Sequence, residues 1–162
     1  MKSIDYVKCD LGYWEIQEDN GKIIAVNFVG DYKNDFRENK NKENEKINSP
    51  LMNEAKKQLE EYFSGNRKEF SLPLLLEGTP FQKRVWEALQ EIPYGKTRSY
   101  QEIATVVGNK NSGRAVGGAN HNNPISIIVP CHRVIGKNGS LVGYGGGLDA
   151  KEFLLLLEER FL

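Results

Sequence analysis

The stretch SYQEIATVVGNKNSGRAVGGANHNNPISIIVPCHRVIG, residues 99–136, carries the signals that decide the fold of this chain. Ser99 followed three residues later by Glu102 is the pattern of a capping box, which predicts that a helix begins there. A turn rich in Asn and Gly over residues 108–113 comes next, and a second short helix is expected over residues 114–122. Two short helices joined by a turn are the outline of a helix-turn-helix, although two-helix hairpins are also common in proteins that do not bind DNA.

The sequence before this stretch predicts two domains. Thr79-Pro80-Phe81-Gln82 is a further capping box, so another helix precedes the helix-turn-helix. Asp19-Asn20-Gly21 between alternating residues indicates a β-hairpin, and Ser49-Pro50 indicates the start of a helix. The expected domains are an α/β domain over residues 1–77, with a charged loop at 32–49, and a mostly helical, winged-helix-like domain over residues 78–162.

The composition limits the class of partner and the compartment. Lysine and arginine (22) balance aspartate and glutamate (22), and this zero net charge taken alone argues against a nucleic-acid partner. Residues 80–137, however, hold 8 basic and 3 acidic side chains, so positive charge concentrates around the motifs. No apolar run reaches the ~18 residues that span a membrane and no signal-peptide pattern opens the chain. We therefore expect a cytoplasmic protein whose two cysteines stay reduced.

Cys131 is the candidate reactive residue. It follows the apolar run of residues 125–129, which is expected to be a buried strand that ends at a cleft. A lone cysteine is more often a buried structural residue. The adjacent His132 and Arg133 favour the reactive alternative, because both could lower the pKa of the thiol and so produce the nucleophilic thiolate. The cysteines and histidines fit no zinc-ligand spacing, so no metal is expected.

The helix expected over residues 114–122 is unusually small in its side chains, which include Ala115, Gly117, Gly118 and Ala119. Small residues serve tight helix–helix packing. An exposed helix of this kind could instead enter a narrow groove of DNA, where Arg114 would insert among stacked bases. Asn123 precedes Pro124 and must leave helical geometry, and its amide can tie the helix to the cysteine loop.

Two features follow the cysteine. Residues 143–147 are rich in glycine but lack the Gly-Lys-Ser/Thr ending of a phosphate loop. The glycines either give the loop a flexible backbone with no further role, or let the backbone and Tyr144 come close to a flat ligand. Asp149-Ala150-Lys151-Glu152 has the pattern of a capping box, so Glu152 either caps a helix or orients a histidine as the third member of a Cys-His-acid relay.

Together these motifs resemble the O6-alkylguanine-DNA alkyltransferases, also called methylated-DNA–protein-cysteine methyltransferases. The segment VPCHRVI carries the resemblance, preceded by PYGKTRSYQEIA and RAVGGANHNNP and followed by GYGGGLDAKEFLL. It is nearly continuous over residues 78–158. The resemblance implies a small ribonuclease-H-like N-terminal domain, with an antiparallel sheet and a helix, in front of the helix-turn-helix domain.

The resemblance implies DNA repair by one irreversible transfer for each protein molecule. Cys131 would take the alkyl group from O6-alkylguanine, with O4-methylthymine as a second possible substrate, and the sulfur would lie open to the flipped base. His132 would remove the thiol proton through a bridging water while Glu152 holds the imidazole tautomer. Tyr100 would protonate the departing guanine and help to turn the nucleotide out, and Asn123 would be a hinge.

The implied partner is double-stranded DNA containing O6-alkylguanine, bound through the minor groove by a monomer, with no cofactor, metal or membrane. The residues implied for DNA contact are Arg114, Ala115, Gly117, Gly118, Ala119, Tyr100, His121 and Arg133. His121 stands where many relatives have a more basic residue. The residues implied for the guanine pocket are Tyr144, Gly145, Gly146 and Val134.

Three alternatives remain open beside this interpretation. An alkyltransferase-like protein binds the lesion without transfer, and in such proteins the acceptor cysteine is replaced, whereas Cys131 is present here. A winged-helix regulator with an incidental cysteine would leave Tyr100, Asn123 and Glu152 unexplained as a set. A cysteine hydrolase would need a second histidine far along the chain to serve as its base.

Overall fold

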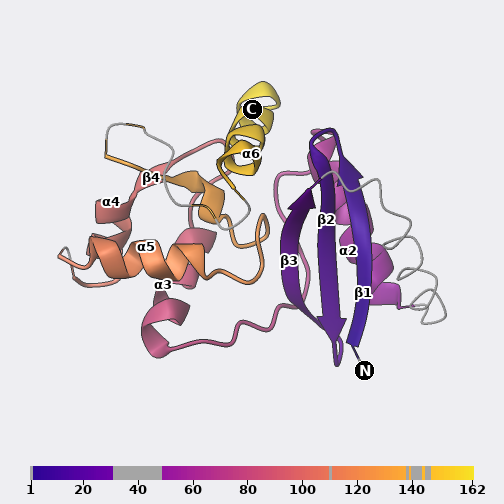
Figure 1. Cartoon of the computed structure of the whole chain (residues 1–162), viewed down its shortest axis with the longest axis horizontal. Helices are drawn as coiled ribbons and strands as arrows, with labels where there is room; N and C mark the ends of the chain where they lie inside the picture. Colours follow the sequence, from indigo (N-terminus) through magenta and orange to yellow (C-terminus); the bar gives the residue numbers. More distant parts are fainter. Residues whose placement is uncertain (1, 31–48, 110, 138, 140–143, 145–146) are drawn as a thin grey trace. The chain divides into compact units, whose positions relative to one another are not determined.

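The structure is a computed structural model that describes residues 2–30, 49–109, 111–137, 139, 144 and 147–162 (Figure 1). The chain divides into two compact units, Met1–Leu75 and Leu76–Leu162, a boundary two residues before the predicted one. Each unit holds buried apolar side chains of its own. Apart from Ser49, the charged loop expected at 32–49 lies outside the described residues.

The N-terminal unit is built on a three-stranded antiparallel sheet in the order β1 (Lys2–Cys9), β2 (Gly12–Asp19), β3 (Lys22–Gly30). Asn20 (φ 50°) and Gly21 (φ 77°) form the turn between β2 and β3. Positive φ at both central positions is what a type I′ turn requires, and Asn-Gly meets that requirement with little strain. The predicted hairpin is confirmed.

β1 is a strand that its local sequence does not indicate. Its charged residues Lys2, Asp5 and Lys8 recur at every third position, which is not the alternation of a half-buried strand. The strand forms because it pairs with β2 along its whole length. Cross-strand pairing therefore overrides a weak local pattern here.

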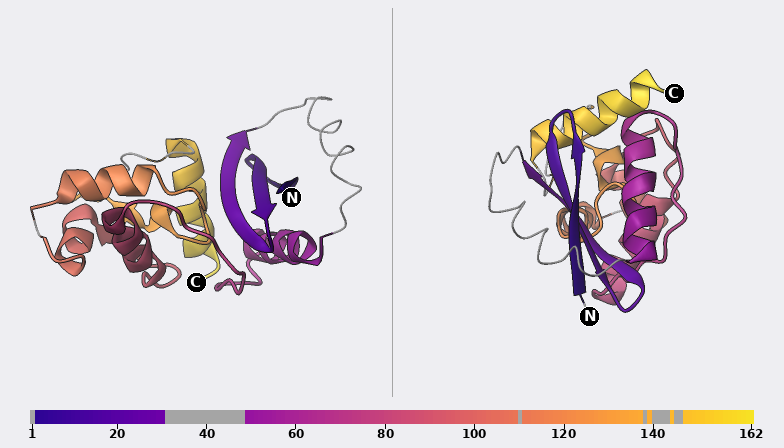
Figure 2. Two further views of the ribbon diagram at one scale, coloured as in Figure 1. Left: turned by 90° about the horizontal axis from the view of Figure 1, so that it is seen from below. Right: turned by 90° about the vertical axis from the view of Figure 1, so that its right-hand side faces the viewer.

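Helix α2 (Pro50–Phe63) covers one face of this sheet (Figures 1 and 2). Ser49 caps the helix as predicted, because its hydroxyl accepts a hydrogen bond from the backbone N–H of Met52 at 3.1 Å. Leu59 of α2 and Trp14 of β2 are fully buried. The unit is thus a helix packed on a sheet, as expected for a small α/β domain.

The C-terminal unit begins with three helices, α3 (Pro80–Gln90), α4 (Tyr100–Val106) and α5 (Gly113–His121), and α5 packs against both of the others. Thr79 and Ser99 each form the predicted capping box, with reciprocal side-chain to backbone hydrogen bonds. The helix-turn-helix is therefore confirmed in α4 and α5. None of the described helices is long and apolar enough to cross a membrane.

The rest of the unit carries the cysteine. The two-residue strand β4 (Arg98–Ser99) pairs in parallel with β5 (Val134–Ile135), which follows a 3₁₀ turn, η1 (Cys131–Arg133). Helix α6 (Leu148–Arg160) closes the chain. The capping box expected at its start is wrong, because the N-cap is Gly147 with φ 94° and no side chain caps the helix.

The apolar run of residues 125–129 is a series of turns, and the predicted strand is wrong. The N–H of Val129 donates to the carbonyl of Ile125 at 3.1 Å, so the segment turns back on itself, and only Ile125 at its start forms an isolated β-bridge. Ile127 has φ 71°, which a β-branched residue adopts only when its surroundings impose it. The run is apolar because it is buried.

Candidate active site

Cys131 begins η1 and is 3 % exposed, so the sulfur does not lie open in the protein alone and that expectation is wrong. The side chain of Asn123 shapes the loop that leads to it. Its amide donates to the carbonyl of Val129 at 2.8 Å and its oxygen accepts from the N–H of Ile125 at 3.0 Å. Asn123 thus ties the residue just beyond α5 to the cysteine loop, which is where a hinge would have to lie.

The environment of the thiol differs from the one predicted. Burial raises the pKa of Cys131 above its ordinary value. The polar side chains of Asn123, Ser126 and Tyr144 and the charge of Lys151 act to lower that pKa. The prediction that His132 and Arg133 would do so is wrong, since both of these side chains pair with a carboxylate of α6.

Lys151 is the cation beside the thiol, and no role in the chemistry was predicted for it. The side chain is fully buried, and its Nζ donates to the carbonyl of Val134 at 2.5 Å and lies 5.9 Å from the ring centroid of Tyr100. Burial lowers the pKa of Lys151 to about 8, against the effect of Cys131, whose charge would raise it. The lysine can therefore favour a thiolate in a site that otherwise opposes charge.

Glu158, and not Glu152, is the carboxylate that holds His132. His132 Nε2 and Glu158 Oε2 lie 2.5 Å apart, and both side chains are almost completely buried. Glu152 is exposed, so its predicted role as the orienting acid is wrong. Burial lowers the pKa of His132 and favours the neutral imidazole. Burial acts to raise the pKa of Glu158, but the hydrogen bonds and charges of its partners outweigh it and hold this pKa well below its ordinary value.

A helical repeat in α6 could have identified both missed residues. Lys151, Leu154 and Glu158 are spaced three and four residues apart, so they share one face of the helix, and all three are buried. Glu152 lies about 100° further round the helix and faces solvent. The four consecutive leucines over residues 154–157 hide this repeat, because they are apolar on every face.

Three residues predicted to contact DNA or substrate point into the unit instead. Arg133 is 6 % exposed and pairs with Glu158, so it is not available to DNA. Ala119 is buried, and its carbonyl accepts a hydrogen bond from Trp86 Nε1 at 2.9 Å. The side chain of Val134 is fully buried, so this residue can offer a ligand its backbone only. In each case a neighbouring helix or strand covers the side chain.

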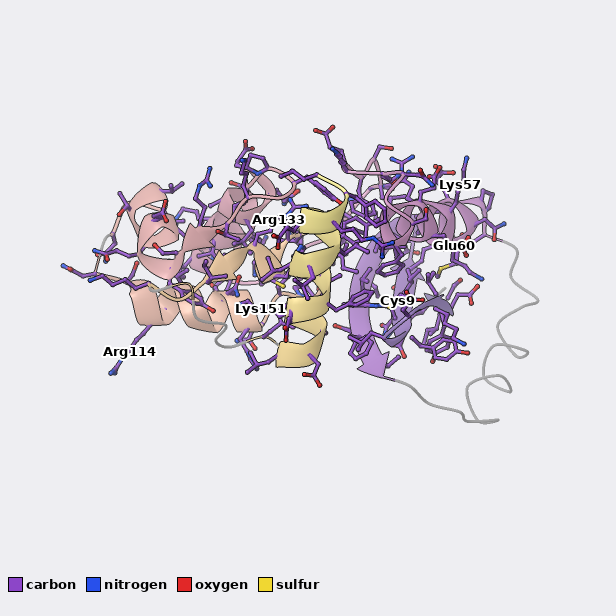
Figure 3. All side chains as sticks on the ribbon, turned by 90° about the horizontal axis from the view of Figure 1, so that it is seen from above. Cys9, Lys57, Glu60, Arg114, Arg133 and Lys151 are labelled. Atoms are coloured by element: carbon purple, nitrogen blue, oxygen red, sulfur yellow. The ribbon has the colours of Figure 1, made fainter. Side chains whose placement is uncertain are left out.

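Two of the other small residues of α5, Ala115 and Gly118, lie on its outer face, and Gly117 is half-buried. Arg114, Ala115, Gly118 and His121 are exposed, and Figure 3 shows Arg114 pointing away from the helix. A Cβ built on Gly118 would meet nothing within 4 Å, and one on Gly117 would only reach the Tyr100 ring at 4.0 Å. Tight packing within the protein therefore does not explain the glycine at position 118. The face is free for an external surface.

Two tyrosines lie near the sulfur. Tyr100 begins α4, and burial together with the charge of Cys131 raises the pKa of its hydroxyl. Tyr144 is 7 % exposed, and burial and the charge of Cys131 raise its pKa well above the ordinary value. Both hydroxyls therefore keep their protons at neutral pH and can donate hydrogen bonds. Gly145 and Gly146, predicted to line the guanine pocket, lie outside the described residues.

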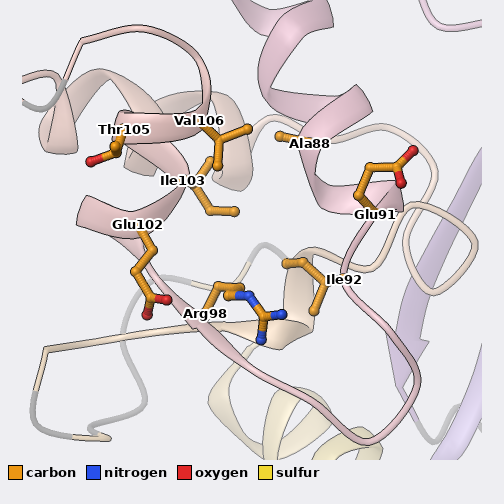
Figure 4. Close-up of a pocket in the computed structure, with 8 residues that line it drawn as sticks. All are labelled: Ala88, Glu91, Ile92, Arg98, Glu102, Ile103, Thr105 and Val106. Atoms are coloured by element: carbon orange, nitrogen blue, oxygen red, sulfur yellow. The ribbon is translucent and has the colours of Figure 1, made fainter.

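A cavity of about 440 Å³ lies elsewhere in the C-terminal unit, between the end of α3 and helix α4 (Figure 4). Its lining residues are Ala88, Glu91, Ile92, Arg98, Glu102, Ile103, Thr105 and Val106. None of the side chains around Cys131 is among them, so this cavity is not the candidate active site. Over the described residues, no group of three or more His, Cys, Asp or Glu side chains could hold a metal ion.

Two family models match the chain. The one described as "6-O-methylguanine DNA methyltransferase, ribonuclease-like domain" matches residues 4–76, and "6-O-methylguanine DNA methyltransferase, DNA binding domain" matches residues 80–160. Together they cover both units and confirm the predicted fold. The second match spans every element that surrounds Cys131.

Individual relatives agree with these matches. A methylated-DNA–protein-cysteine methyltransferase of Methanosarcina acetivorans is 62% identical over 111 residues, 68% of this chain and 71% of the relative. The constitutive enzyme of that name from Bacillus subtilis is 58% identical over 111 residues, 68% of this chain and 67% of the relative.

Solved structures extend the likeness to the whole chain. The crystal structure of Mycobacterium tuberculosis O6-methylguanine methyltransferase covers 100% of this chain and 95% of its own, at 40% identity and a TM-score of 0.82. The structure of the M. tuberculosis protein OGT in complex with DNA covers 98% of this chain and 94% of its own, at 38% identity and the same TM-score. The chain described here belongs to the 6-O-methylguanine DNA methyltransferase family.

Proposed function

We propose that this protein repairs DNA by moving the alkyl group of O6-alkylguanine onto its own Cys131. The observation that carries the proposal is the buried set around that sulfur, with Lys151 beside the thiol and the His132–Glu158 pair next to it in the chain. The names of the relatives, methylated-DNA–protein-cysteine methyltransferases, support the same reaction. Both cysteines of the chain are free thiols, as a reducing cytoplasm would keep them.

The reaction balances with the groups of this site. The thiol proton passes through a water molecule to His132, and the thiolate attacks the alkyl carbon from behind. The S–C bond forms as the C–O6 bond breaks, and its electron pair stays on guanine. Tyr100 protonates the leaving guanine and recovers a proton from the imidazolium. One proton leaves sulfur, one reaches guanine, and the thioether remains, so each molecule acts once.

DNA is expected to meet the outer face of α5 as a duplex bound by one protein molecule. The small exposed residues Ala115 and Gly118 would let the helix enter the minor groove, and Arg114 would fill the stack after the nucleotide turns out. Flipping is required because a stacked base does not present its alkyl carbon to a thiolate. Since Cys131 is buried, side chains around the sulfur must also move to admit the base.

Intact-mass spectrometry after incubation with a duplex oligonucleotide containing O6-methylguanine tests the proposal. We expect the protein to gain the mass of one methyl group, located on Cys131 by peptide mapping, and Cys131→Ala to bind the duplex without gaining mass. An O4-methylthymine duplex is the second arm and defines the substrate range. Binding by the wild-type protein with no gain in mass would contradict transfer and leave lesion binding alone.

A further inference from the structure

We propose that Arg133 is a positioning residue that fixes the tautomer of His132. In this arrangement Glu158 is a carboxylate whose acceptor positions are all occupied, so His132 carries its hydrogen on Nε2 and keeps the lone pair of Nδ1 for the thiol proton. The inference rests on the proposed function and adds to it a residue that contacts neither substrate nor sulfur.

The hydrogen bonds of Glu158 can be counted atom by atom. Oε1 accepts from the backbone N–H of Gly95 at 2.9 Å and from Arg133 Nε at 2.9 Å. Oε2 accepts from Arg133 Nη2 at 3.0 Å and lies 2.5 Å from His132 Nε2. A carboxylate offers about four lone-pair positions, and these four contacts use them. Three of the four come from groups that can only donate, and the fourth is the contact with the imidazole.

The identity of the donors then decides the state of His132. A backbone N–H and a guanidinium can only donate, and a guanidinium does not lose its proton in a protein. Burial acts to raise the pKa of Glu158, but the hydrogen bonds and charges of His132 and Arg133 hold it well below its ordinary value, so Glu158 is an ionised carboxylate that can only accept. The short contact to Nε2 is then a hydrogen bond that Nε2 donates. The other nitrogen, Nδ1, is buried and has no hydrogen-bond partner among the described residues.

Arg133 is itself held from a second direction. Its Nη1 donates to the carbonyl of Ile92 at 2.7 Å, in the turn that follows α3, and its guanidinium carbon lies 5.7 Å from the ring centroid of Tyr94. Gly95, in the same turn, donates to Glu158. The turn after α3, η1 and α6 therefore meet at one carboxylate, which gives Glu158 little freedom to rotate away from the imidazole.

The charges around His132 also favour a neutral imidazole with an unprotonated Nδ1. The groups that act on it are Glu158 and Lys151 from α6 and Arg133 from η1, with Cys131 as its chain neighbour and Tyr94 on the far side of Arg133. Burial, Arg133 and Lys151 lower the pKa of His132, while Glu158 raises it. Without Arg133 the charge of Glu158 would be unopposed, His132 would hold a second proton near neutral pH, and Nδ1 would no longer be a base.

The tautomer can be measured in the wild-type protein without any substrate. The chain has two histidines, so His121→Gln assigns the signals of His132 in ¹⁵N–¹H correlation spectra. We expect the Nε2–H tautomer at pH 7, with Nδ1 at the shift of an unprotonated nitrogen. A hydrogen on Nδ1, or an imidazolium at pH 7, would overturn the inference.

The role of Arg133 is tested by pH–rate profiles with the free base O6-benzylguanine, which removes DNA contacts from the comparison. Arg133→Gln should shift the rise in rate to higher pH by about one unit or more, the range expected for loss of a nearby charge. At any pH below the pKa of His132 in both proteins the rate would then be at least about tenfold lower, and it would recover in alkaline buffer. Arg133→Lys keeps the positive charge and should restore most of the wild-type dependence of rate on pH. Arg84→Gln removes an exposed arginine of α3 and should leave the wild-type pH dependence unchanged.

Failure of this inference can be told apart from failure of the proposed function. If wild-type Cys131 takes no alkyl group from DNA or from the free base, the proposed function fails. If wild-type protein is alkylated but the glutamine variant loses rate equally at every pH, Arg133 is only structural and the inference fails. If Arg133→Gln does not fold, the tautomer of His132 in the wild type and the pH–rate profile of Arg133→Lys test the inference instead.

Discussion

The two units of this chain treat charged side chains in opposite ways. In the N-terminal unit the ion pairs Lys56–Asp5 and Arg67–Glu61 lie at the surface, with side chains 26 to 35% exposed. In the C-terminal unit Arg133 and Glu158 pair in the interior, at 7% and 1% exposure. Surface pairs contribute little to stability, whereas burying charges costs several kcal/mol that a well-packed apolar core would not incur.

This difference locates the chemistry. The N-terminal unit buries Trp14, Ile16 and Leu59 and is stabilised mainly by apolar surface removed from water. The C-terminal unit also has an apolar core but keeps His132, Lys151 and other ionisable groups buried around one cysteine. Such a cluster is expected where perturbed pKa values serve a reaction. Four substitutions test this contrast between the two units.

Glu158→Gln should have the largest effect. The amide oxygen could still accept from Gly95, but the amide NH₂ would face two donors, and His132 would have to move its hydrogen to Nδ1. We expect transfer to slow by about 10²-fold or more, the usual contribution of a general base, and stability to fall by roughly 3–5 kcal/mol because Arg133 loses its partner. Alkylation rates and denaturant unfolding measure the two effects.

Glu152→Gln is the matched control for this change, since it alters an exposed carboxylate on the same helix. It should leave both rate and stability close to the wild-type values. A large loss of rate in this control would indicate that Glu152 orients His132 and would contradict the assignment of that role to Glu158.

Leu59→Ala should lower the free energy of unfolding by about 2–5 kcal/mol, because it opens a cavity between α2 and the sheet. At a temperature where the variant is folded, its rate with O6-benzylguanine should equal that of the wild type. Chemical denaturation and single-turnover kinetics on the same sample test both statements. A rate that falls along with stability would mean that the N-terminal unit takes part in the chemistry, and the contrast between the units would fail.

The elements that could be predicted from sequence are those whose cause is local. Asn20-Gly21 specifies its turn by backbone preference, and Thr79 and Ser99 start their helices by hydrogen bonds to residues three positions away. Cys131 was identified because a thiol beside histidine is chemically distinctive. These features need no knowledge of what packs against them.

The predictions that proved wrong concern places where residues distant in sequence determine the local structure or the partner of a side chain. The run before Cys131 was expected to be a strand, but the side chain of Asn123 satisfies its backbone and turns it. His132 was expected to lower the pKa of Cys131 because it is the next residue, although its ring points to Glu158, 26 positions along the chain. Glu152 was assigned as the orienting acid from the family resemblance, at the end of the pattern Asp149-Ala150-Lys151-Glu152. The 3.6-residue repeat that places Glu158 inward was concealed by four leucines.

Lys151→Met should alter the pH dependence of stability. The pKa of Lys151 is about 8 in the folded protein and lies near 10.5 when exposed. Between these values the unfolded chain binds more protons, so rising pH stabilises the wild type relative to the methionine variant, by about 3 kcal/mol over the window. Below pH 8 Lys151 is charged in the folded protein, so the wild type bears the full free-energy cost of burying that charge. Unfolding free energies of both proteins at pH 7, 8, 9 and 10 give the difference.

The same substitution should slow transfer at pH 7, because the thiolate of Cys131 loses the positive charge of Lys151 and the pKa of the thiol rises further. A variant that gains stability at neutral pH and loses rate would show that the buried charge is kept for chemistry. If the stability difference between the two proteins were flat from pH 8 to 10, Lys151 would not titrate in this range and its burial would need another explanation.

Gly118→Ala should have the smallest effect on the free protein and separates the two uses of small residues in α5. A Cβ at this position meets nothing within 4 Å, so the helix should gain about 0.5–1 kcal/mol from the better helix former. If the outer face of α5 enters the minor groove, the same methyl group must stand between the helix backbone and the DNA. The variant should then bind duplex DNA more weakly than the wild type while reacting at the same rate with O6-benzylguanine. Unchanged affinity for the duplex, measured by fluorescence anisotropy at one fixed salt concentration, would show that this face is not the DNA surface, and the excess of small side chains on it would have to serve something else.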